Sequence, residues 1–532
     1  MRRFLAALLL CPSLLSAQDT TKPKLVVIIA VDQMRSEYVD RFRGDFVGGF
    51  KRMLDGGIFF ENATLNYAVS ETAPGHATLS SARYPSTNGI IANEWYDPKL
   101  KRKIYCVEDS SALVVEGEGG FRSSKNLVGS SLGDWLKQSS PGSKVISISD
   151  KDRAAILLGG KKPDGTYWYD KSTGHMVSSS YYFSQLPDWA RSFNAADWVR
   201  KFLPMIWNKL QPDSLYPGAD EFEGELVWDG VSSAFPHFFA SNKRKEAILT
   251  SPFADQMVLD FAREAVKAER LGQRSETDLL CVGLSATDYI GHAFGPNSHE
   301  MRDNLLRLDL ALGSFLADLE SSVGRGKILV AIGADHAVMP LPEYLTRILF
   351  KSARRINWKT SVGSVIDSLN VAWQKRYSLK GKAVLQEGFI NYVAAAKAGL
   401  SSAKLESILR NALLGTGVVA DLFFTHELID KRTKDRLFLQ QYRNSYYPPR
   451  WEDFQILPKE FMLFTSGKTG TSHGSAYDYD THVPVLFWGK TFTTNRSATP
   501  VHTVDVAPTL AKLMGIPIPK QIDGVPIKEA LQ

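Results

Sequence analysis

Four short runs of apolar, often β-branched residues each end abruptly in an acidic residue. The runs read KLVVIIAVDQM, SKVISISDKDR, DLLCVGLSATD and KILVAIGADH, and their acidic residues are Asp32, Asp150, Asp288 and Asp335. Continuous apolar runs of this length are typical of strands buried on both faces, as in a parallel sheet covered by helices. Because sites in open α/β sheets form beyond the carboxyl ends of the strands, these acidic residues mark a candidate site.

Helical patterns fill the intervals between the runs, for example NLLRLDLALGSFLADLES from Asn304. This alternation favours an α/β sandwich with a mostly parallel central sheet and helices on both faces. Two less regular stretches, at about 160–250 and about 340–465, are predicted to be insertions that cap this core. The 532 residues are enough for one large catalytic domain over 18–532 that carries both insertions.

The first twenty residues, MRRFLAALLLCPSLLSAQDT, have the pattern of a secretory signal peptide. Arg2 and Arg3 precede an apolar run, and the small residues Ser16 and Ala17 follow it. We therefore expect residues 1–17 to be removed on export and the protein to be secreted, with a periplasmic location. A membrane anchor is the alternative, but the apolar run is too short to span a bilayer, so no stable membrane insertion is expected.

Charge and cysteine content argue against several other classes of protein. Loss of Arg2 and Arg3 would lower the formal net charge from +6 to +4, and the remaining charges are dispersed, so no nucleic-acid partner is expected. Cys11 would leave with the signal peptide, and Cys106 and Cys281 alone cannot form a disulfide framework or a thiolate metal cluster. Cys281 is expected to be a buried hydrophobic residue, and whether it pairs with Cys106 stays open.

Aspartate and histidine residues recur together at the predicted strand ends and in loops. SATDYIGHAFGP carries an Asp and a His four residues apart, GADHAV carries an adjacent pair, and GTSHGSAYD carries a further His. With the first strand-end aspartate, the set is Asp32, Asp288, His292, Asp335, His336 and His473. Carboxylate oxygen and neutral imidazole suit Zn²⁺, and six ligands are enough for two ions with positions left open for substrate. Two metal ions about 4 Å apart can stabilise both the attacking and the leaving oxygen of an in-line phosphoryl displacement.

Each of these residues also has a structural interpretation. An Asp at a strand end is often a helix N-cap, and His336 alone could be a hydrogen-bonded core histidine. His482 is the alternative to His473 because it also precedes an apolar run, in YDTHVPVLFWG. Three more histidines are expected to be plain hydrogen-bonded residues rather than supports for metal ligands: His76, His299 and His502. Four motifs that each place an Asp or His at a strand end or in a loop are nevertheless hard to explain by structural roles alone.

The ordered motifs resemble those of the alkaline phosphatase superfamily. They are Asp32, TAPGHATL, SATDYIGHAFGP, ADH, SHG and HTVDVAPTLAKLMGIPIPKQIDG, and they span most of the chain, from Asp32 to Gly524. VDQMR, ANEWYD and DKDRAAILLGG look most like the PafA-type alkaline phosphatases, which are secreted bacterial phosphomonoesterases with a Thr nucleophile. The resemblance implies an alkaline-phosphatase-like sandwich. Its two-metal core is shared with nucleotide pyrophosphatase/phosphodiesterases and, in part, with sulfatases.

The resemblance also implies a role for particular residues. Thr72, in ETAPGHATLSS, would be the nucleophile, which spacing alone does not single out. The zinc ion that contacts and activates Thr72 would be held by Asp32, Asp335 and His336. The zinc ion that binds the leaving-group oxygen would be held by Asp288, His292 and His473. The non-bridging phosphoryl oxygens would be bound by Asn93, Lys151 and Arg153.

General chemistry is consistent with these roles. Thr72 stands where a loop enters a predicted helix, so backbone N–H groups would face a bound anion, although a helix N-cap fits the same position. Lys151 and Arg153 are two residues apart, so on an extended segment they would share one face and suit a phosphate dianion. Sulfatases need Cys or Ser at the position of Thr72, with Pro and Arg two and four residues on. The chain has Pro74 and His76 there, so a sulfatase is not expected.

The expected function is hydrolysis of small-molecule phosphate monoesters by a monomeric di-zinc enzyme, through a phospho-threonine intermediate. A phosphodiesterase of the nucleotide pyrophosphatase kind, on the same two-metal core, is the first alternative. A non-catalytic, zinc-stabilised binding protein that has kept the fold is the second. The magnesium site of the best-known alkaline phosphatases is not expected, because the sequence offers no further acidic set for it.

Overall fold

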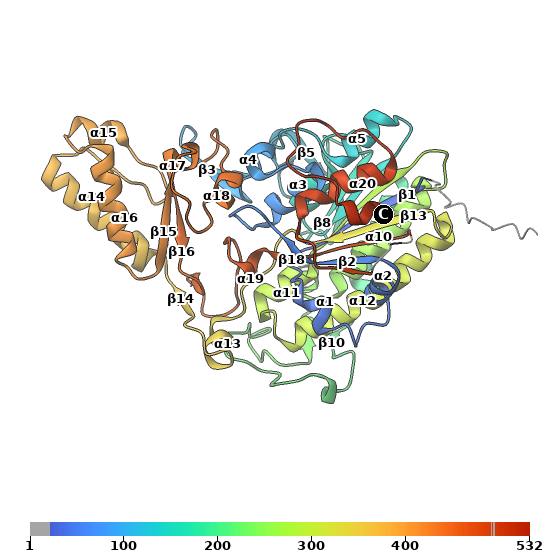
Figure 1. The fold of residues 1–532 in the computed structure, drawn as a ribbon. Coiled ribbons are helices and arrows are strands. Elements are labelled where there is room, and N and C mark those ends of the chain that lie inside the picture. Colours follow the sequence, from blue (N-terminus) through green and yellow to red (C-terminus); the bar gives the residue numbers. More distant parts are fainter. Residues whose placement is uncertain (1–21, 491, 493–494) are drawn as a thin grey trace, which may run out of the picture.

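A twelve-stranded sheet forms the centre of the protein (Figure 1). The computed structural model describes residues 22–490, 492 and 495–532, so the predicted signal peptide at 1–17 lies outside the described residues. Strand β1 (Leu25–Val31) pairs in parallel with β12 (Asp278–Leu284) on one side and β13 (Ile328–Gly333) on the other. β7 (Val145–Ser149) and β8 (Gly165–Asp170) continue the parallel pairing beyond β12. The predicted mostly parallel sheet is confirmed.

Antiparallel strands complete the sheet on both sides of this parallel centre. β18 (His482–Trp488) pairs antiparallel with both β13 and β2 (Ile58–Thr64). On the opposite side, β9 (His175–Ser179) pairs antiparallel with β8. Because β8 and β9 lie within residues 160–250, the first part of that stretch extends the central sheet. The division of the chain into a catalytic domain with two insertions stays a prediction.

Helices cover both faces of the sheet, as predicted. Successive side chains of a strand point to opposite faces, and in β1 the residues Val27 and Ile29 pack in one hydrophobic core while Val26 and Ile28 pack in another. The first core includes residues of α2 (Gly49–Gly56), α10 (Phe253–Glu269) and α12 (His299–Val323). The second includes residues of α3 (Thr72–Ser81), α5 (Leu132–Ser139) and α20 (Val506–Met514).

The three central strands end level with one another, and this register creates the candidate site. Val31 of β1 lies opposite Leu284 of β12, and Ala30 lies opposite Gly333 of β13. The chain therefore leaves all three strands at the same edge of the sheet, which is where the strand-end aspartates follow.

Residues from about 342 to 464 form a lobe beside the core, seen at the left of Figure 1 and called the cap lobe below. It contains α14 (Ser364–Tyr377), α16 (Ser402–Leu414) and the antiparallel pair β15 (Val419–Phe424) and β16 (Phe454–Pro458). These elements share a hydrophobic cluster of their own, which includes Trp373, Leu409 and Leu422. The cap lobe falls within the second predicted insertion, whose status as an insertion stays a prediction.

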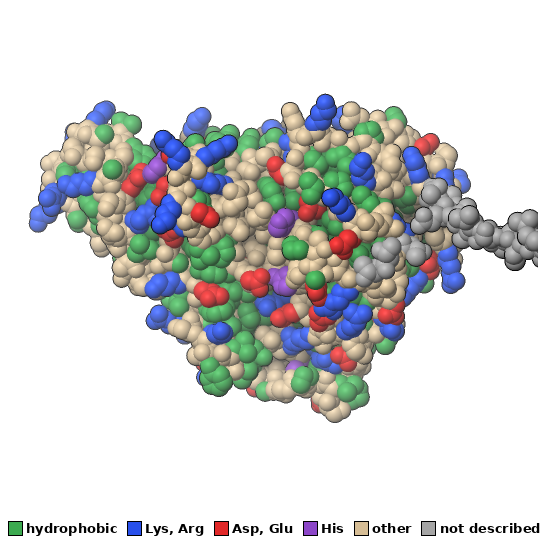
Figure 2. Space-filling model, in the orientation of Figure 1, with side chains coloured by type: hydrophobic (Ala, Val, Ile, Leu, Met, Phe, Trp, Pro, Cys, Tyr) green, Lys and Arg blue, Asp and Glu red, His purple; other side chains and the backbone are tan. Residues whose placement is uncertain are grey.

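Both remaining cysteines, Cys106 and Cys281, are buried and free, so the open question of their pairing is answered. The prediction that Cys281 is a buried hydrophobic residue is confirmed. Within the described ranges, no helix combines the length and hydropathy needed to cross a bilayer. On the face drawn in Figure 2, basic and acidic side chains are interspersed over the core and the cap lobe.

Candidate active site

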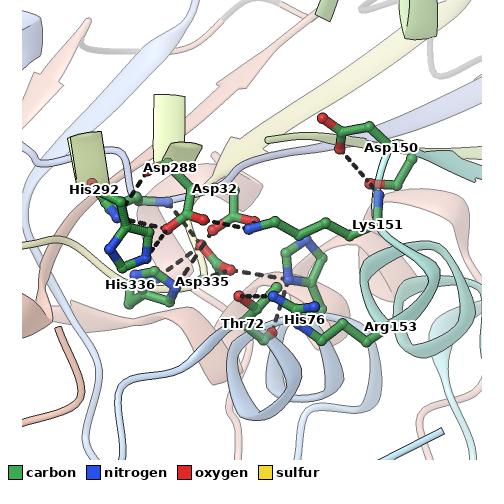
Figure 3. Close-up of polar contacts among 12 residues, drawn as sticks. Asp32, Thr72, His76, Asp150, Lys151, Arg153, Asp288, His292, Asp335 and His336 are labelled. Carbon is green, nitrogen blue, oxygen red and sulfur yellow. Dashed lines mark hydrogen bonds and ion pairs between the residues drawn. The ribbon is translucent and has the colours of Figure 1, made fainter. Parts of the chain in front are cut away.

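Three aspartates from three different strand ends meet at one point (Figure 3). Asp32 directly follows β1, Asp335 comes two residues after β13, and Asp288 lies in α11 (Ala286–Phe294), just beyond β12. All three are buried, with at most 3% of each residue exposed. The Nζ atom of Lys151 lies 2.7 Å from Asp32 Oδ2 and 2.5 Å from Asp288 Oδ2, so one ammonium group bridges two of the carboxylates.

Two histidines complete a first group around Asp288. His292 Nε2 lies 3.2 Å from Asp288 Oδ1, and His473 Nε2 lies 3.6 Å from the same oxygen. The Nδ1 atoms face backbone carbonyls, Thr471 O at 2.8 Å for His292 and Ser70 O at 2.6 Å for His473. Because a carbonyl can only accept, each Nδ1 carries the proton and each Nε2 keeps its lone pair for a ligand, as is usual for metal-binding histidines.

A second group forms on the other side of Asp288. Potential ligand atoms of Asp32, Asp288 and His336 all lie within 4.8 Å of one another, as do those of Asp288, His292 and His473. His336 Nδ1 donates to Ala337 O at 3.0 Å, which again leaves Nε2 free. The buried atoms of this region that have no hydrogen-bond partner among the described residues include Asp32 Oδ1, Asp335 Oδ2 and His336 Nε2. The donor set of carboxylate oxygens and imidazole nitrogens therefore fits one or two divalent cations, zinc in particular.

Asp335 adjoins the second group without belonging to its compact part. Its predicted role, to share a metal ion with Asp32 and His336, stays a prediction. Its Oδ2 lies 3.5 Å from His336 Nε2 and 3.1 Å from His76 Nδ1, while its Oδ1 accepts from the backbone N–H of His336 at 3.0 Å. Asp335 thus adjoins the second group from the side of helix α3.

The pKa values of the carboxylates reflect their crowding. Burial and the nearby charges of Asp288 and Asp335 raise the pKa of Asp32 to about 7. Burial also opposes ionisation of Asp288, but the charges of Lys151 and His292 outweigh it and hold the pKa of Asp288 well below its usual range. Burial, together with His336 and His292, lowers the pKa of His473, so this imidazole stays neutral. A site that crowds buried carboxylates together beside the neutral imidazole of His473 is chemically suited to bind cations, because a cation would favour ionisation of all three carboxylates.

Helix α3 brings Thr72 to this cluster. Thr72 is the first residue of α3, after Glu71, and it is 1% exposed. A Cβ added to Gly75, one turn on, would lie 2.4 Å from the Cβ and the backbone oxygen of Asp335, so only glycine lets the helix approach this closely. The expected helix entry at Thr72 is confirmed, and the N-cap residue is Glu71, whose side chain makes no capping hydrogen bond.

The residues predicted to bind phosphoryl oxygens surround Thr72 from two directions. Arg153 Nη2 lies 3.4 Å from Thr72 Oγ1. Asn93 accepts a hydrogen bond on Oδ1 from the backbone N–H of Ala73 at 2.9 Å, and its own N–H donates to Glu71 at 2.6 Å. Arg153 therefore contacts the Thr72 hydroxyl, and Asn93 contacts the residues on either side of Thr72, Glu71 and Ala73.

The expected extended segment at Lys151 and Arg153 is wrong. Lys151 is extended, with φ −108° and ψ 134°, but α6 (Asp152–Gly159) begins at the next residue, so Arg153 is already helical. The two side chains diverge as a result (Figure 3): Lys151 contacts the carboxylates of Asp32 and Asp288, and Arg153 points toward Thr72. They approach the site from one helix end but on different sides.

Sequence reasoning missed Gln33, which touches two of the aspartates. Its backbone N–H donates to Asp335 Oδ1 at 3.1 Å, and its Nε2 donates to Asp288 Oδ1 at 2.6 Å. Gln33 has φ +66°, a left-handed conformation that costs a non-glycine residue about 1–2 kcal/mol. Its Oε1 would lie 1.8 Å from a Cβ on Gly291, so that glycine makes room for the side chain. No sequence signal marks Gln33 apart from its position after Asp32.

The other histidines separate into two kinds. His76 is fully buried and lies 3.1 Å from Asp335 Oδ2, so it supports a strand-end aspartate and the expectation of a plain hydrogen-bonded residue is wrong for it. His299 and His502 face Pro217 O and Thr64 Oγ1, in keeping with that expectation. His482 faces Glu61 O at 2.7 Å, whereas His473 adjoins Asp288 and His292, so the structure favours His473 over its alternative.

Comparison with known proteins places this architecture in a family. Residues 26–482 match the sequence profile described as Type I phosphodiesterase / nucleotide pyrophosphatase. The chain is 34% identical to alkaline phosphatase PhoV of Synechococcus elongatus, over 97% of this chain and 94% of PhoV. It is 32% identical to alkaline phosphatase PafA of Elizabethkingia meningoseptica, over 100% of this chain and 99% of PafA. A crystal structure of PafA covers 96% of this chain and 99% of its own, with a TM-score of 0.88 at 31% identity. The chain therefore belongs to the type I phosphodiesterase/nucleotide pyrophosphatase family of the alkaline phosphatase superfamily.

Proposed function

We propose that this protein is an alkaline phosphatase that hydrolyses phosphate monoesters through a phosphorylated Thr72. The observation that carries the proposal is the convergence of Thr72, Arg153 and two cation-binding groups at one buried point. Full-length relatives named alkaline phosphatases support the same activity. The family name leaves a phosphodiesterase as the second candidate, since both reactions need the same core.

Two zinc ions are the proposed cofactors. One would be held by Asp288, His292 and His473, and the other by Asp32, Asp335 and His336 beside Thr72. The histidines support zinc over magnesium or calcium, which prefer all-oxygen sites. Bound there, the ions would lower the pKa of the Thr72 hydroxyl and stabilise negative charge on the departing oxygen.

The remaining residues bind and orient the ester. Arg153, with its planar guanidinium 3.4 Å from Thr72 Oγ1, is placed to bind two non-bridging phosphoryl oxygens at once. Thr72 Oγ1 would form a bond to phosphorus while the bond to the ester oxygen breaks, leaving a phospho-threonine that water then hydrolyses. Asn93 contributes a side-chain amide, and its contact with the N–H of Ala73 ties it to the helix that carries the nucleophile.

Lys151 has a more complex role than phosphate binding alone. Burial would lower the pKa of its ammonium group, but Asp288 and Asp32 outweigh burial and raise that pKa, so the group is charged. We infer that Lys151 keeps the two carboxylates apart and correctly aimed, in addition to attracting a phosphate dianion.

We further propose that the protein acts outside the cytoplasm as a secreted, periplasmic monomer. The pattern of residues 1–17 supports export, and acidic and basic side chains are interspersed on the face drawn in Figure 2. Small phosphate monoesters are the proposed substrates.

Thr72→Ala should abolish nearly all phosphate release from p-nitrophenyl phosphate, because the attacking oxygen is lost. Thr72→Ser keeps the hydroxyl and should retain a substantial part of kcat. Steady-state kinetics of both variants provide the measurement, with zinc content determined alongside to exclude loss of metal. Normal turnover by the alanine variant would place the nucleophile elsewhere, and a metal-loaded wild type without turnover would indicate the non-catalytic binding protein.

The purified protein should contain about two zinc ions per chain, because Asp32, Asp288, His292, His336 and His473 form two compact groups that share Asp288, and Asp335 adjoins one of them. Elemental analysis measures the content directly. Prolonged chelation should remove both the zinc and the activity, and added zinc should restore them. A single ion per chain, or activity that survives complete metal removal, contradicts the two-metal site.

Gln33→Ala should weaken zinc retention by about 10- to 100-fold, the range for loss of a residue that orients metal ligands. The reason is that Asp288 loses its 2.6 Å hydrogen bond from Gln33 Nε2. Gln33→Gly is the matched control: it relieves the left-handed strain but also lacks the amide, so it should regain stability and not zinc affinity. Competition with a chromophoric chelator measures affinity, and thermal unfolding measures stability. Zinc affinity unchanged in both variants would show that Gln33 serves the fold alone.

A further inference from the structure

One hairpin of the core lies beside both Asn93 and Arg153, and no step proposed above uses its second strand. The hairpin joins β3 (Glu94–Asp97) to β4 (Arg102–Tyr105), and the two strands pair antiparallel. Asn93 immediately precedes β3, and its backbone carbonyl accepts a hydrogen bond from the N–H of Cys106, just after β4, at 2.9 Å. The hairpin therefore fixes Asn93 and places Tyr105, the last residue of β4, at the same end.

The hydroxyl group of Tyr105 connects Arg153 to Asp152. Arg153 Nη1 donates to Tyr105 Oη at 3.4 Å, and Tyr105 Oη donates to Asp152 Oδ1 at 2.5 Å. A phenolic hydroxyl can accept one hydrogen bond while it donates another, so both contacts can exist together. Burial and the charge of Asp152 raise the pKa of the Tyr105 hydroxyl well above its usual value, so the hydroxyl keeps its proton.

Arg122 holds both Asp152 and Tyr105 in place. Its Nε donates to Asp152 Oδ2 at 2.6 Å, and its guanidinium carbon lies 4.9 Å from the centre of the Tyr105 ring. Asp152 is the first residue of α6, and its Oδ1 also accepts from the backbone N–H of Arg153 at 2.6 Å. Arg122, Asp152 and Tyr105 are therefore tied to one another and to the helix that carries Arg153.

These contacts leave one edge of the Arg153 guanidinium available near Thr72. Nη1 is bound to Tyr105, Nη2 lies 3.4 Å from Thr72 Oγ1, and Nε is buried without a hydrogen-bond partner among the described residues. Nε and Nη2 lie on the same edge of the planar group, and two N–H groups on one edge match two oxygens of a phosphate. A buried donor without a partner costs free energy, and a phosphoryl oxygen would supply the missing acceptor.

We propose that Tyr105 is a positioning residue for phosphoryl transfer. Its hydroxyl holds Nη1 of Arg153, so that the edge formed by Nε and Nη2 is turned toward the phosphoryl group at Thr72. The proposal rests on the proposed phosphatase function and adds a residue that acts through Arg153. The hairpin of β3 and β4 would then place both side chains that bind phosphoryl oxygens beside Thr72, Asn93 directly and Arg153 through Tyr105.

The test is a double-mutant cycle between Tyr105→Phe and Arg153→Ala in the zinc-loaded enzyme. Tyr105→Phe keeps the ring and removes only the hydroxyl, and it should lower kcat/KM for p-nitrophenyl phosphate about tenfold, the effect of one hydrogen bond to a charged group. In the Arg153→Ala background the same change should lower kcat/KM by less than about twofold, because no guanidinium remains to be positioned. Equilibrium dialysis with inorganic phosphate should show the same dependence, with binding weakened by Tyr105→Phe only when Arg153 is present.

Tyr392→Phe is the matched control, because the Tyr392 hydroxyl also donates to a carboxylate, Glu406 Oε1 at 2.7 Å, but does so in the cap lobe. It should leave kcat/KM and phosphate binding unchanged in both backgrounds. Additive losses from Tyr105→Phe and Arg153→Ala, or unchanged kcat/KM in Tyr105→Phe, would overturn the positioning role and leave the phosphatase intact. Phosphate binding that depends on Tyr105 only when Arg153 is present, in a wild type that hydrolyses no ester, would support the positioning role and refute the phosphatase.

Discussion

The structure depends on the concentration of negative charge at one edge of the parallel sheet. Asp32, Asp288 and Asp335 are almost wholly buried, and Lys151 is the only lysine among the described residues that contacts any of them through its side chain. Burial of unpaired carboxylates is strongly unfavourable, so the fold must supply compensating positive charge. Bound divalent cations are the simplest compensation. The same cations would provide the chemistry, so the requirement of the fold and that of the reaction coincide.

Two glycines let other parts of the chain pack closely around these carboxylates. Gly75 lets helix α3 touch the backbone of Asp335, and Gly291 leaves space for Gln33. Gln33 holds Asp288 and Asp335 from a left-handed backbone conformation, the kind of local strain that is found where function outweighs stability. Thr72, at the start of α3, is held beside these carboxylates by the close packing of its helix against Asp335.

The central strands and the aspartates that follow them could be predicted because each strand is a continuous apolar run with an abrupt end. The pairing of Asp288 with His292 could also be predicted, because residues four apart lie on the same face of a helix. The choice of His473 over His482 could not be made from sequence, since both precede apolar runs and only the folded chain brings one of them to Asp288. Gln33 could not be identified from the sequence, because its contacts with Asp288 and Asp335 depend on its left-handed backbone conformation. The divergence of Lys151 and Arg153 depends on a helix that begins between them, and helix ends are poorly encoded by local sequence.

The most direct test of the central claim compares a phosphate monoester with a diester. A monoester dianion presents three non-bridging oxygens, whereas one of these is capped in a diester. Arg153 is the appropriate residue to remove, because removal of Lys151 would also leave Asp32 and Asp288 without their shared partner. A charge-assisted hydrogen bond contributes about 1.5–3 kcal/mol, or about 10- to 150-fold in rate. Wild type should prefer the monoester strongly, and Arg153→Ala should lower kcat/KM for the monoester far more than for the diester. Equal losses, or a wild type that prefers diesters, would contradict the monoesterase and establish the phosphodiesterase instead.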